Sequence, residues 1–528
     1  MRRWNGWGEE AVHLDLPQSA LAYLRERLGE GVPPRDARFE DVLASAEPSR
    51  LPAHPTIDTS AATRVLHARG QSLPDWLALR FGRIDRLPDG VAFPESSQDV
   101  RELFEYARDV GACIIPYGGG TSVVGHINPP ERCERPVLTV SLARMRRLLD
   151  LDEESRLATF GAGVAGPDLE AQLRTHGYTL GHFPQSFEYS TLGGWVVTRS
   201  SGQQSLRYGR IEQLFAGGRL ETPSGTLAIP TVPASAAGID LRELVLGSEG
   251  RLGILTEATV RVRPVPAHES FHGWFFPTWE RAEAAVRALA HAGLPLSMIR
   301  LANAHETLTT LRLANAGIAL AFLERYLQLR GYGDERSLLI VGITGDAESV
   351  RSTLASARDI AGDRNGLYFG TQLGKRWQKN RFHGVYLRNA LWEHGYAVDT
   401  VETAVDWPRV GTMVAAIESA AHAAFGSEAI HGYTHLSHVY AQGSSVYSTF
   451  IFRIAPTYEE NLHRWQQLKS AVSEAIVANG GTISHQHGVG TDHRPYLVAE
   501  KGLLGIDAMR ALFRDFDPDA MMNPGKLC

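Results

Sequence analysis

Apolar positions along the chain follow a strand-like spacing in some segments and a helical spacing in others. Strand-like runs lie at 91–94, 113–116, 137–140, 157–161, 219–222, 254–262, 337–344 and 446–454. Apolar residues recur every three or four positions, as in amphipathic helices, at 19–28, 99–110, 279–293, 348–361 and 458–479. Because the two kinds of element are interleaved, the pattern predicts an α+β protein.

The order of these elements divides the chain into four segments. We expect a helical arm that decorates the fold, two α+β domains and a closing segment, at 1–87, 88–266, 267–479 and 480–528. The first domain opens with a β-α-β pattern, in which Ser97 is the expected N-cap of the helix.

The composition fits a globular chain of enzyme size. The 528 residues are 43% hydrophobic and 21% charged, which is enough to bury more than one core. A net charge of −6 gives no field that favours nucleic acid, so we expect no nucleic-acid partner.

Three cysteines are too few to stabilise the fold through disulfides, which favours a reducing, cytoplasmic location. We expect neither a signal peptide nor a membrane-spanning helix, and contact with a membrane surface stays open.

A glycine-rich loop follows the strand-like run at 113–116. The three glycines of PYGGGTS at 116–122 let backbone N–H groups turn toward one anion without obstruction by a Cβ. The loop lacks the ending of a nucleotide P-loop and the spacing of a Rossmann fingerprint. On its own it fits a phosphate cradle and a tight structural turn equally well.

Two further loops are rich in glycine and hydroxyl groups. One spans 181–202, and the other, GSEGRLGIL at 247–255, runs directly into a strand. Three such loops from one domain can surround an extended cofactor that has a pyrophosphate and a flat ring system. The set therefore predicts a large cofactor, which a single loop would not.

These loops resemble the flavin-binding domain of the vanillyl-alcohol-oxidase superfamily. The whole chain is similar to the alkylglycerone-phosphate synthase family, also called alkyl-dihydroxyacetone-phosphate synthases. The strings that carry this likeness are WNGWG at 4–8, SFEYSTLGGW at 186–195, IRL at 299–301 and SHQHGVG at 484–490. The resemblance implies a two-lobed FAD-binding domain at 88–266, an α+β cap domain at 267–479 that binds the substrate, and a C-terminal segment at 480–528 that returns to the flavin.

The resemblance also implies FAD that is held without a covalent bond. His126 is the nearest candidate for covalent attachment, and we interpret it as an ordinary loop residue. The positions that correspond to FAD-binding residues of the family are Pro116, Tyr117, Gly118, Gly119, Gly120, Thr121, Ser122, Gln185, Ser186, Phe187, Glu188, Tyr189, Ser190, Thr191, Thr198, Arg199, Ser200, Ser201, Glu249, Gly250, Arg251, Leu252, Gly253, Ile254 and Leu255.

The string at 484–490 places two imidazoles two residues apart. In an extended backbone His485 and His487 point to the same side, and imidazoles move protons near neutral pH. A metal site is the competing interpretation, because related flavin-linked 2-hydroxy-acid dehydrogenases bind zinc through a histidine-rich motif and a later Glu. That motif would correspond to His431, His435 and His438. The Glu position is Gln486, a poor ligand, so we expect no metal.

The resemblance assigns further roles to single residues. It implies that Tyr447 acts with His485 and His487 in catalysis, and that the substrate is bound by Arg388, Arg300 and His435. A guanidinium can hold phosphate through two parallel hydrogen bonds, which is the role expected of Arg388. As an acid or base, the Tyr447 phenol would need a pKa lowered by cations or the flavin. Without the resemblance, we would interpret Tyr447 as a buried core tyrosine whose hydroxyl has a hydrogen-bond partner. Arg300 could equally form a salt bridge that holds two domains together.

Two positions depart from the family pattern. His435 stands where the family has Arg, and Gln486 replaces the middle member of three consecutive histidines. The first change removes a positive charge near the implied site, and the second removes an imidazole. Both changes count against a phosphate-bearing substrate.

The implied activity is that of an FAD-dependent transferase in ether-lipid synthesis. It would exchange the acyl chain of acylglycerone phosphate for a long-chain fatty alcohol, without net redox change. The alternative is an FAD-linked oxidase or dehydrogenase of an alcohol or 2-hydroxy acid, which the missing imidazole at Gln486 favours modestly. A homodimer stays open.

One apolar segment has the length of a helix. Residues 318–327 carry aromatic and aliphatic side chains, and a buried helix of the cap domain is the favoured interpretation. A wall of a tunnel for a fatty chain and a membrane contact are the alternatives.

Overall fold

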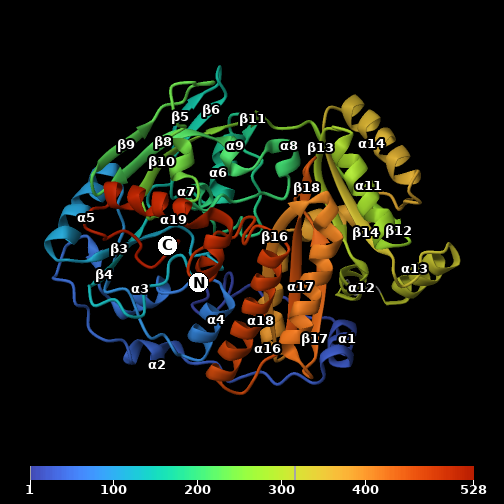
Figure 1. Ribbon diagram of the computed structural model, residues 1–528, viewed down its shortest axis with the longest axis horizontal. Coiled ribbons are helices and arrows are strands. Elements are labelled where there is room, and N and C mark those ends of the chain that lie inside the picture. Colours follow the sequence, from blue (N-terminus) through green and yellow to red (C-terminus); the bar gives the residue numbers. More distant parts are fainter. Residues whose placement is uncertain (1, 314–316) are drawn as a thin grey trace.

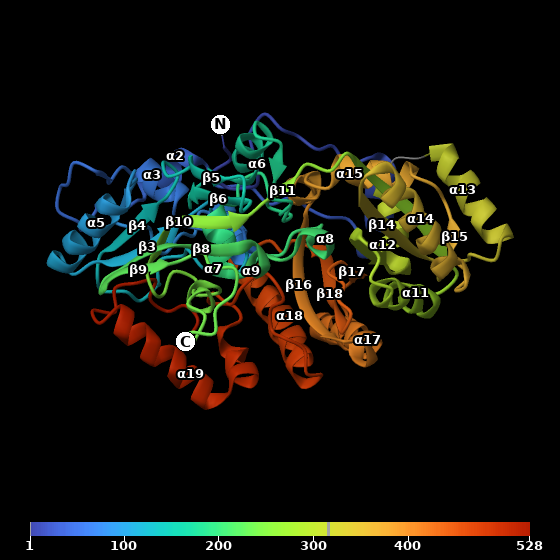
Figure 2. The ribbon, with the colours of Figure 1, turned by 90° about the horizontal axis from the view of Figure 1, so that it is seen from above.

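The chain folds into two lobes that lie side by side (Figures 1 and 2). The computed structural model describes residues 2–313 and 317–528, and the side chains from 313 to 319 lie outside the described set. The first lobe is built mainly from elements between Ile57 and Pro264, and the cap lobe mainly from elements between His268 and Ala478, with α1 (Gln18–Leu28) packed beside β17 (Ile430–Leu436) of the cap lobe. Helices and predominantly antiparallel sheets occur in both, which confirms the predicted α+β class.

The N-terminal arm packs against both lobes. Its strand β1 pairs with β2 of the first lobe, whereas Trp7 and Trp76 are buried in the hydrophobic core of the cap lobe. The arm is therefore a structural part of both lobes rather than a decoration. Its elements are α1 (Gln18–Leu28), α2 (Phe39–Ala44), β1 (Ile57–Asp58), α3 (Ala61–Leu66) and α4 (Leu73–Arg80).

The first sheet of the first lobe contains the β-α-β unit. Strands β2 and β3 both pair with β4 in parallel, and α5 connects β2 to β3. The N-cap of α5 is Ser96, one residue before the predicted Ser97, because its hydroxyl accepts a hydrogen bond from the Asp99 N–H. In sheet order the strands are β1, β2 (Gly90–Ala92), β4 (Val137–Ser141) and β3 (Cys113–Tyr117), and α5 is Ser97–Asp109.

The second sheet of the first lobe is antiparallel and shares one hydrophobic core with the first sheet. Its strand order is β5 (Leu148–Asp152), β6 (Leu157–Gly161), β10 (Ile254–Arg261), β8 (Phe215–Thr222) and β9 (Gly225–Ile229). Short helices connect these strands: α6 (Gly166–Arg174), α7 (Leu192–Thr198), α8 (Ser205–Tyr208), α9 (Ile211–Leu214) and α10 (Arg242–Val245). A two-stranded ribbon of β7 (Tyr178–Thr179) and β11 (Arg263–Pro264) lies beside them.

The cap lobe is built on one antiparallel sheet that is larger than the sequence pattern predicts. Its strand order is β15 (Leu367–Tyr368), β12 (His268–Phe276), β14 (Ser337–Gly345), β13 (Leu296–Ala302), β17 (Ile430–Leu436), β18 (Gly443–Arg453) and β16 (Tyr396–Asp406). Its helices are α11 (Trp279–His291), α12 (Ala304–Leu313), α13 (Gly317–Leu329), α14 (Ala347–Gly362), α15 (Gln372–Asn380), α16 (Leu387–Glu393), α17 (Val410–Phe425) and α18 (Tyr458–Ala478).

The C-terminal segment returns from the cap lobe to the first lobe. Helix α19 (Leu497–Phe516), red in Figure 1, lies against the first lobe, and Met522 bridges to Ile114 of β3. The backbone between α18 and α19 therefore crosses the junction of the lobes.

Helix α13 is not the fully buried helix that we expected from residues 318–327. Leu320 and Leu327 are buried, but Phe322 is 70% exposed and Tyr326 is 43% exposed. The side chains of Ile318 and Ala319 lie outside the described residues. Among the helices that the structure describes, none has the length and apolar character needed to cross a membrane.

Candidate active site

A cavity of about 1000 Å³ lies at the junction of the two lobes. This volume is at the upper end of the range typical of small-molecule and cofactor sites. The three glycine-rich loops of the first lobe form part of its wall, and strands of the cap lobe form another part. The C-terminal segment contributes Gln486 and His487.

Most residues expected to bind FAD line this cavity. They are Pro116, Tyr117, Gly118, Gly119, Gly120, Thr121, Ser122, Gln185, Ser186, Ser190, Thr191, Thr198, Ser200, Ser201, Glu249, Gly250, Gly253, Ile254 and Leu255. The structure places six of the expected residues away from the cavity wall: Phe187, Glu188, Tyr189, Arg199, Arg251 and Leu252.

The six outlying residues support the loops from behind. Glu188 accepts hydrogen bonds from the Tyr386 hydroxyl, and Tyr189 packs edge-on against Trp7. Arg199 forms an ion pair with Glu243. Of the other three, Phe187 stacks on an aromatic ring of the cap lobe, Arg251 donates to a backbone carbonyl of the C-terminal segment, and Leu252 is a core residue.

The glycines of the first loop are required by its packing against the second loop. A Cβ at Gly119 would lie 1.8 Å from the Tyr189 carbonyl oxygen, and a Cβ at Gly118 would lie 2.3 Å from Thr191 Oγ1. Gly120 has φ +70°, a left-handed conformation that favours glycine. The loop is therefore a tight turn that also faces the cavity, so it can serve as a structural turn and as a cradle for a phosphate group at the same time.

The cavity also offers polar groups that lack partners within the described protein. The Ser201 hydroxyl, Gln203 Oε1 and Gln486 Oε1 are buried without a hydrogen bond, and all three residues line the cavity. Buried polar atoms of this kind are normally satisfied, so they indicate a polar ligand. The loops, the volume and these unpaired groups together fit FAD.

The Glu249 carboxylate joins the third loop to the C-terminal segment. It accepts hydrogen bonds from the backbone N–H groups of Val489 at 2.6 Å and Gly490 at 2.8 Å. Its Oε1 also lies 3.1 Å from His126 Nε2, while the other ring nitrogen of His126 lies 2.9 Å from the Ser122 hydroxyl. This contact fixes the backbone next to His487.

Three of the residues expected at the catalytic centre meet in the cavity. The Tyr447 ring stacks on His435 with centroids 4.8 Å apart, and it meets the His487 ring in a T-shaped arrangement with centroids 5.8 Å apart. Burial raises the pKa of Tyr447 to about 12, so the phenol is protonated at neutral pH and can donate a proton. To act as a base, Tyr447 would need a lowered pKa, and the net effect of the surrounding protein groups is the opposite.

Arg300 and Glu306 surround His435. Arg300 forms an ion pair with Glu306, and His435 Nδ1 lies 2.9 Å from the other Glu306 oxygen. Arg300 also lies 3.1 Å from His435 Nδ1. Since a guanidinium has only donors, Nδ1 cannot both accept from Arg300 and donate to Glu306. The charged hydrogen bond to Glu306 is the shorter of the two contacts, which favours a proton on Nδ1.

Arg388 lies on the cavity wall beside the first lobe. It donates to the Gln71 carbonyl oxygen at 2.5 Å, and its guanidinium lies 4.3 Å from the centroid of the Trp76 ring. Burial lowers the pKa of Arg388 to about 10, which leaves it charged at neutral pH. A guanidinium has five N–H donors, so most of them are available to a ligand.

His485 does not line the cavity with His487. Its Nδ1 lies 3.0 Å from Glu402, and its Nε2 lies 2.6 Å from the Tyr440 hydroxyl and 3.0 Å from Arg210. These contacts place a proton on Nδ1 and leave Nε2 as the acceptor. Burial, followed by the charge of Arg210, lowers the pKa of His485 well below its usual value. The geometry thus gives His485 the position of a support behind the cavity wall.

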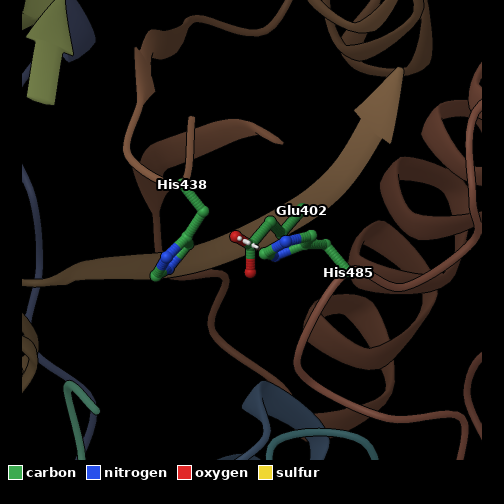
Figure 3. A group of neighbouring side chains, drawn as sticks. All are labelled: Glu402, His438 and His485. Carbon is green, nitrogen blue, oxygen red and sulfur yellow. Dashed lines mark hydrogen bonds and ion pairs between the residues drawn. The ribbon is translucent and has the colours of Figure 1, made fainter. Parts of the chain in front are cut away.

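Figure 3 shows the group of side chains that most resembles a metal site. Possible ligand atoms of Glu402, His438 and His485 lie within 4.8 Å of one another. The Arg210 guanidinium contacts the same His485 ring, and a fixed positive charge there disfavours a bound cation. The three histidines of the upstream motif do not gather, since His431 bonds to Thr309 and His435 to Glu306.

Sequence reasoning missed five polar residues around this centre. Asp399 and Lys469 line the cavity, and behind the wall lie Arg210, Glu402 and Tyr440. Glu402 had a usable signal, because an acid inside the apolar strand pattern at 400–405 must be buried and paired. The others lie in segments without a motif.

Known proteins share both the fold and much of the sequence. Residues 88–229 match a family model described as an FAD binding domain, and residues 265–527 match one described as FAD linked oxidases, C-terminal domain. The alkyldihydroxyacetonephosphate synthase of Dictyostelium discoideum is 32% identical over 527 residues, which covers 98% of this chain and 82% of the relative. That of Trypanosoma brucei brucei is 29% identical, covering 99% and 92%. A solved structure of an alkyldihydroxyacetonephosphate synthase has a TM-score of 0.85 at 28% identity, covering 99% of this chain and 98% of that one.

The contact between the first two loops predicts a sharp effect of Gly119→Ala. Since the new Cβ would lie 1.8 Å from a backbone oxygen, one loop must move. We expect purified protein with less bound flavin, measured as absorbance near the flavin maximum relative to protein, and a lower melting temperature. Gly362→Ala in α14 is the control, because its Cβ meets nothing within 4 Å. Equal flavin content in both variants would contradict the packing argument.

Buried histidines predict that stability falls as the pH is lowered. Burial lowers the pKa of His182, His438 and His493 to about 3 and that of His431 to about 4. Their native pKa values lie below the unfolded value near 6.5, so the unfolded state takes up protons first as pH falls. Each contributes stability that is complete above about pH 6.5 and declines by up to about 1.4 kcal/mol per pH unit below it.

Urea unfolding at pH 7.5, 6.5 and 5.5 measures this decline. Burial raises the pKa of Asp492 to about 6, which opposes the trend by at most one proton. His431→Asn is expected to reduce the slope by about one proton, whereas a slope unchanged by His431→Asn would assign the decline to other groups.

Proposed function

The chain belongs to the alkyldihydroxyacetonephosphate synthase family of FAD-dependent enzymes, and we propose that it exchanges the acyl chain of acylglycerone phosphate for a long-chain fatty alcohol. The observation that carries this proposal is the meeting of Tyr447, His487 and Arg388 in the cavity formed by the FAD-binding loops. In the exchange, the carbon–oxygen bond to the fatty carboxylate breaks and a carbon–oxygen bond to the alcohol forms. The alcohol releases its proton, and no net oxidation occurs.

The residues of the cavity have separate tasks in this reaction. The three glycine-rich loops would hold FAD, which would supply a flat electrophilic ring system for the exchange. Arg388 holds the phosphate through charged hydrogen bonds. Tyr447 donates a proton, consistent with its raised pKa of about 12, and His487 beside it accepts one. Arg300 and His435 line the cavity as the expected substrate-binding residues, and His435, held by Arg300, also stacks on the Tyr447 ring.

Both nitrogens of His126 face protein partners, which supports FAD held without a covalent bond. The observation that favours an FAD-linked oxidase instead is the neutral Gln486 in the cavity, where the family has a third histidine. An oxidase would bleach its flavin with substrate under anaerobic conditions and release hydrogen peroxide in air. The transferase would do neither stoichiometrically.

Purified protein mixed with acylglycerone phosphate and labelled hexadecanol tests the transferase directly. We expect labelled ether product, and its absence together with peroxide release would overturn the proposal in favour of the oxidase. Tyr447→Phe removes the proton donor and is expected to lower the rate roughly a hundredfold or more without loss of flavin. Tyr332→Phe is the matched control, because its hydroxyl bonds to Asn365 on the surface.

We also propose that helix α13 contacts a membrane surface beside the cavity. Leu320 and Leu323 line the cavity on one side of the helix, whereas Phe322 and Leu329 are 70% and 79% exposed on another. The helix lies at the outer edge of the cap lobe in both views (Figures 1 and 2). Exposed Arg325 adds attraction to anionic head groups.

Co-sedimentation with vesicles of phosphatidylcholine and phosphatidylserine measures this contact. The double variant Phe322→Ser, Leu329→Ser removes exposed apolar area and is expected to lower the vesicle partition coefficient at least tenfold. Leu149→Ser on β5 is the control, since Leu149 is 54% exposed on the other lobe. A double variant that binds like the control would contradict the contact.

A further inference from the structure

Lys469 is a buried cation on the cavity wall that no sequence motif marks. It lies on α18, its side chain is 8% exposed, and it reaches the cavity beside Tyr447 and His487. Burial of an ammonium group costs free energy unless the group is paired or binds a ligand. The buried position of Lys469 therefore indicates an ion pair, a ligand or both.

Asp399 holds the Lys469 ammonium group in place. Lys469 Nζ lies 3.2 Å from Asp399 Oδ2 and donates to the Thr400 carbonyl oxygen at 3.0 Å. The Trp465 indole N–H donates to the same Asp399 oxygen at 3.0 Å, which fixes the carboxylate from α18. An ammonium group has three donors, so one remains for a ligand.

Arg388 belongs to the same wall and is coupled to the same carboxylate. The Asp399 charge acts on Arg388, and Asp399, Lys469 and Arg388 all line the cavity. Asp75 and Asp492 also carry acidic groups nearby, but they do not line the cavity. Asp75 already accepts hydrogen bonds from Ser72 and Asn128. Lys469, Arg388 and Asp399 together carry a net charge of +1 on the cavity wall.

Two cations with free donors match a phosphate dianion. Arg388 offers its donors from α16, and the Lys469 ammonium group offers a further charged donor from α18, while Asp399 offsets one of the two positive charges. Of the two departures from the family pattern, His435 removes a positive charge and Gln486 removes an imidazole. Lys469 places a cation on the cavity wall from a different element, helix α18.

We propose that Lys469 and Arg388 together bind the phosphate group of the glycerone substrate, with Asp399 positioning the ammonium group. The assignment rests on the proposed function for its substrate class and extends it by naming a second phosphate-binding residue. Lys469 is thereby a determinant of specificity for phosphorylated over unphosphorylated substrates.

Quenching of flavin fluorescence in the holoenzyme tests this assignment without turnover. Dihydroxyacetone phosphate, dihydroxyacetone and hexadecanol are the three probes. Lys469→Gln removes one charged hydrogen bond and is expected to raise the Kd of dihydroxyacetone phosphate roughly tenfold to a hundredfold, with hexadecanol binding unchanged. Arg464→Gln, which removes a positive charge from the same helix outside the cavity, is the control.

The outcomes separate this assignment from a structural role and from the proposed function. Unchanged affinity for dihydroxyacetone phosphate in Lys469→Gln, or an equal loss of hexadecanol binding, overturns it. Asp399→Asn is the second variant, should Lys469→Gln lose its flavin, and unchanged phosphate affinity there also overturns it. Wild-type protein that binds dihydroxyacetone phosphate through Lys469 but forms no ether supports this assignment while the transferase proposal fails.

Discussion

The hydrogen bonds from Val489 and Gly490 to the Glu249 carboxylate connect the third glycine-rich loop to the backbone that carries His487 into the cavity. Glu249 itself has a left-handed backbone with φ 50°, so the third loop adopts a strained conformation to present this carboxylate. His487 lies two residues before Val489 and reaches the cavity only while this backbone is held. The glycine-rich loops and the cavity wall around His487 are thus coupled through one carboxylate.

The polar groups around the cavity are arranged to keep its interior close to neutral. Burial keeps the histidines uncharged at neutral pH, because it lowers the pKa of His435, His438 and His487. Arg300 and Glu306 neutralise each other, and Lys469 is paired with Asp399. A charged substrate then meets localised donors rather than a diffuse field, which favours orientation over mere attraction.

The sequence allowed the fold class, the β-α-β unit and the three cofactor loops to be predicted, because glycine spacing and strand periodicity are local signals. Strands β16 and β17 escaped prediction because polar residues such as Glu402 and His435 interrupt their apolar pattern. The separation of His485 from His487 was also beyond local reasoning. Alternation in a strand predicts one side for both, but the backbone around them is not a strand in the structure. Lys469 reads as an ordinary helix residue until the tertiary fold places it on a wall.

The N-terminal arm has a consequence for how the molecule is made. Trp7 and Trp76 complete a core whose other members, among them Trp392 and Phe450, leave the ribosome several hundred residues later. Until then the nascent chain carries large aromatic surfaces that its own neighbours cannot cover. During synthesis the N-terminal tryptophans therefore stay exposed until the later core residues have been made. In that interval the chain depends on chaperones or on transient burial to avoid aggregation.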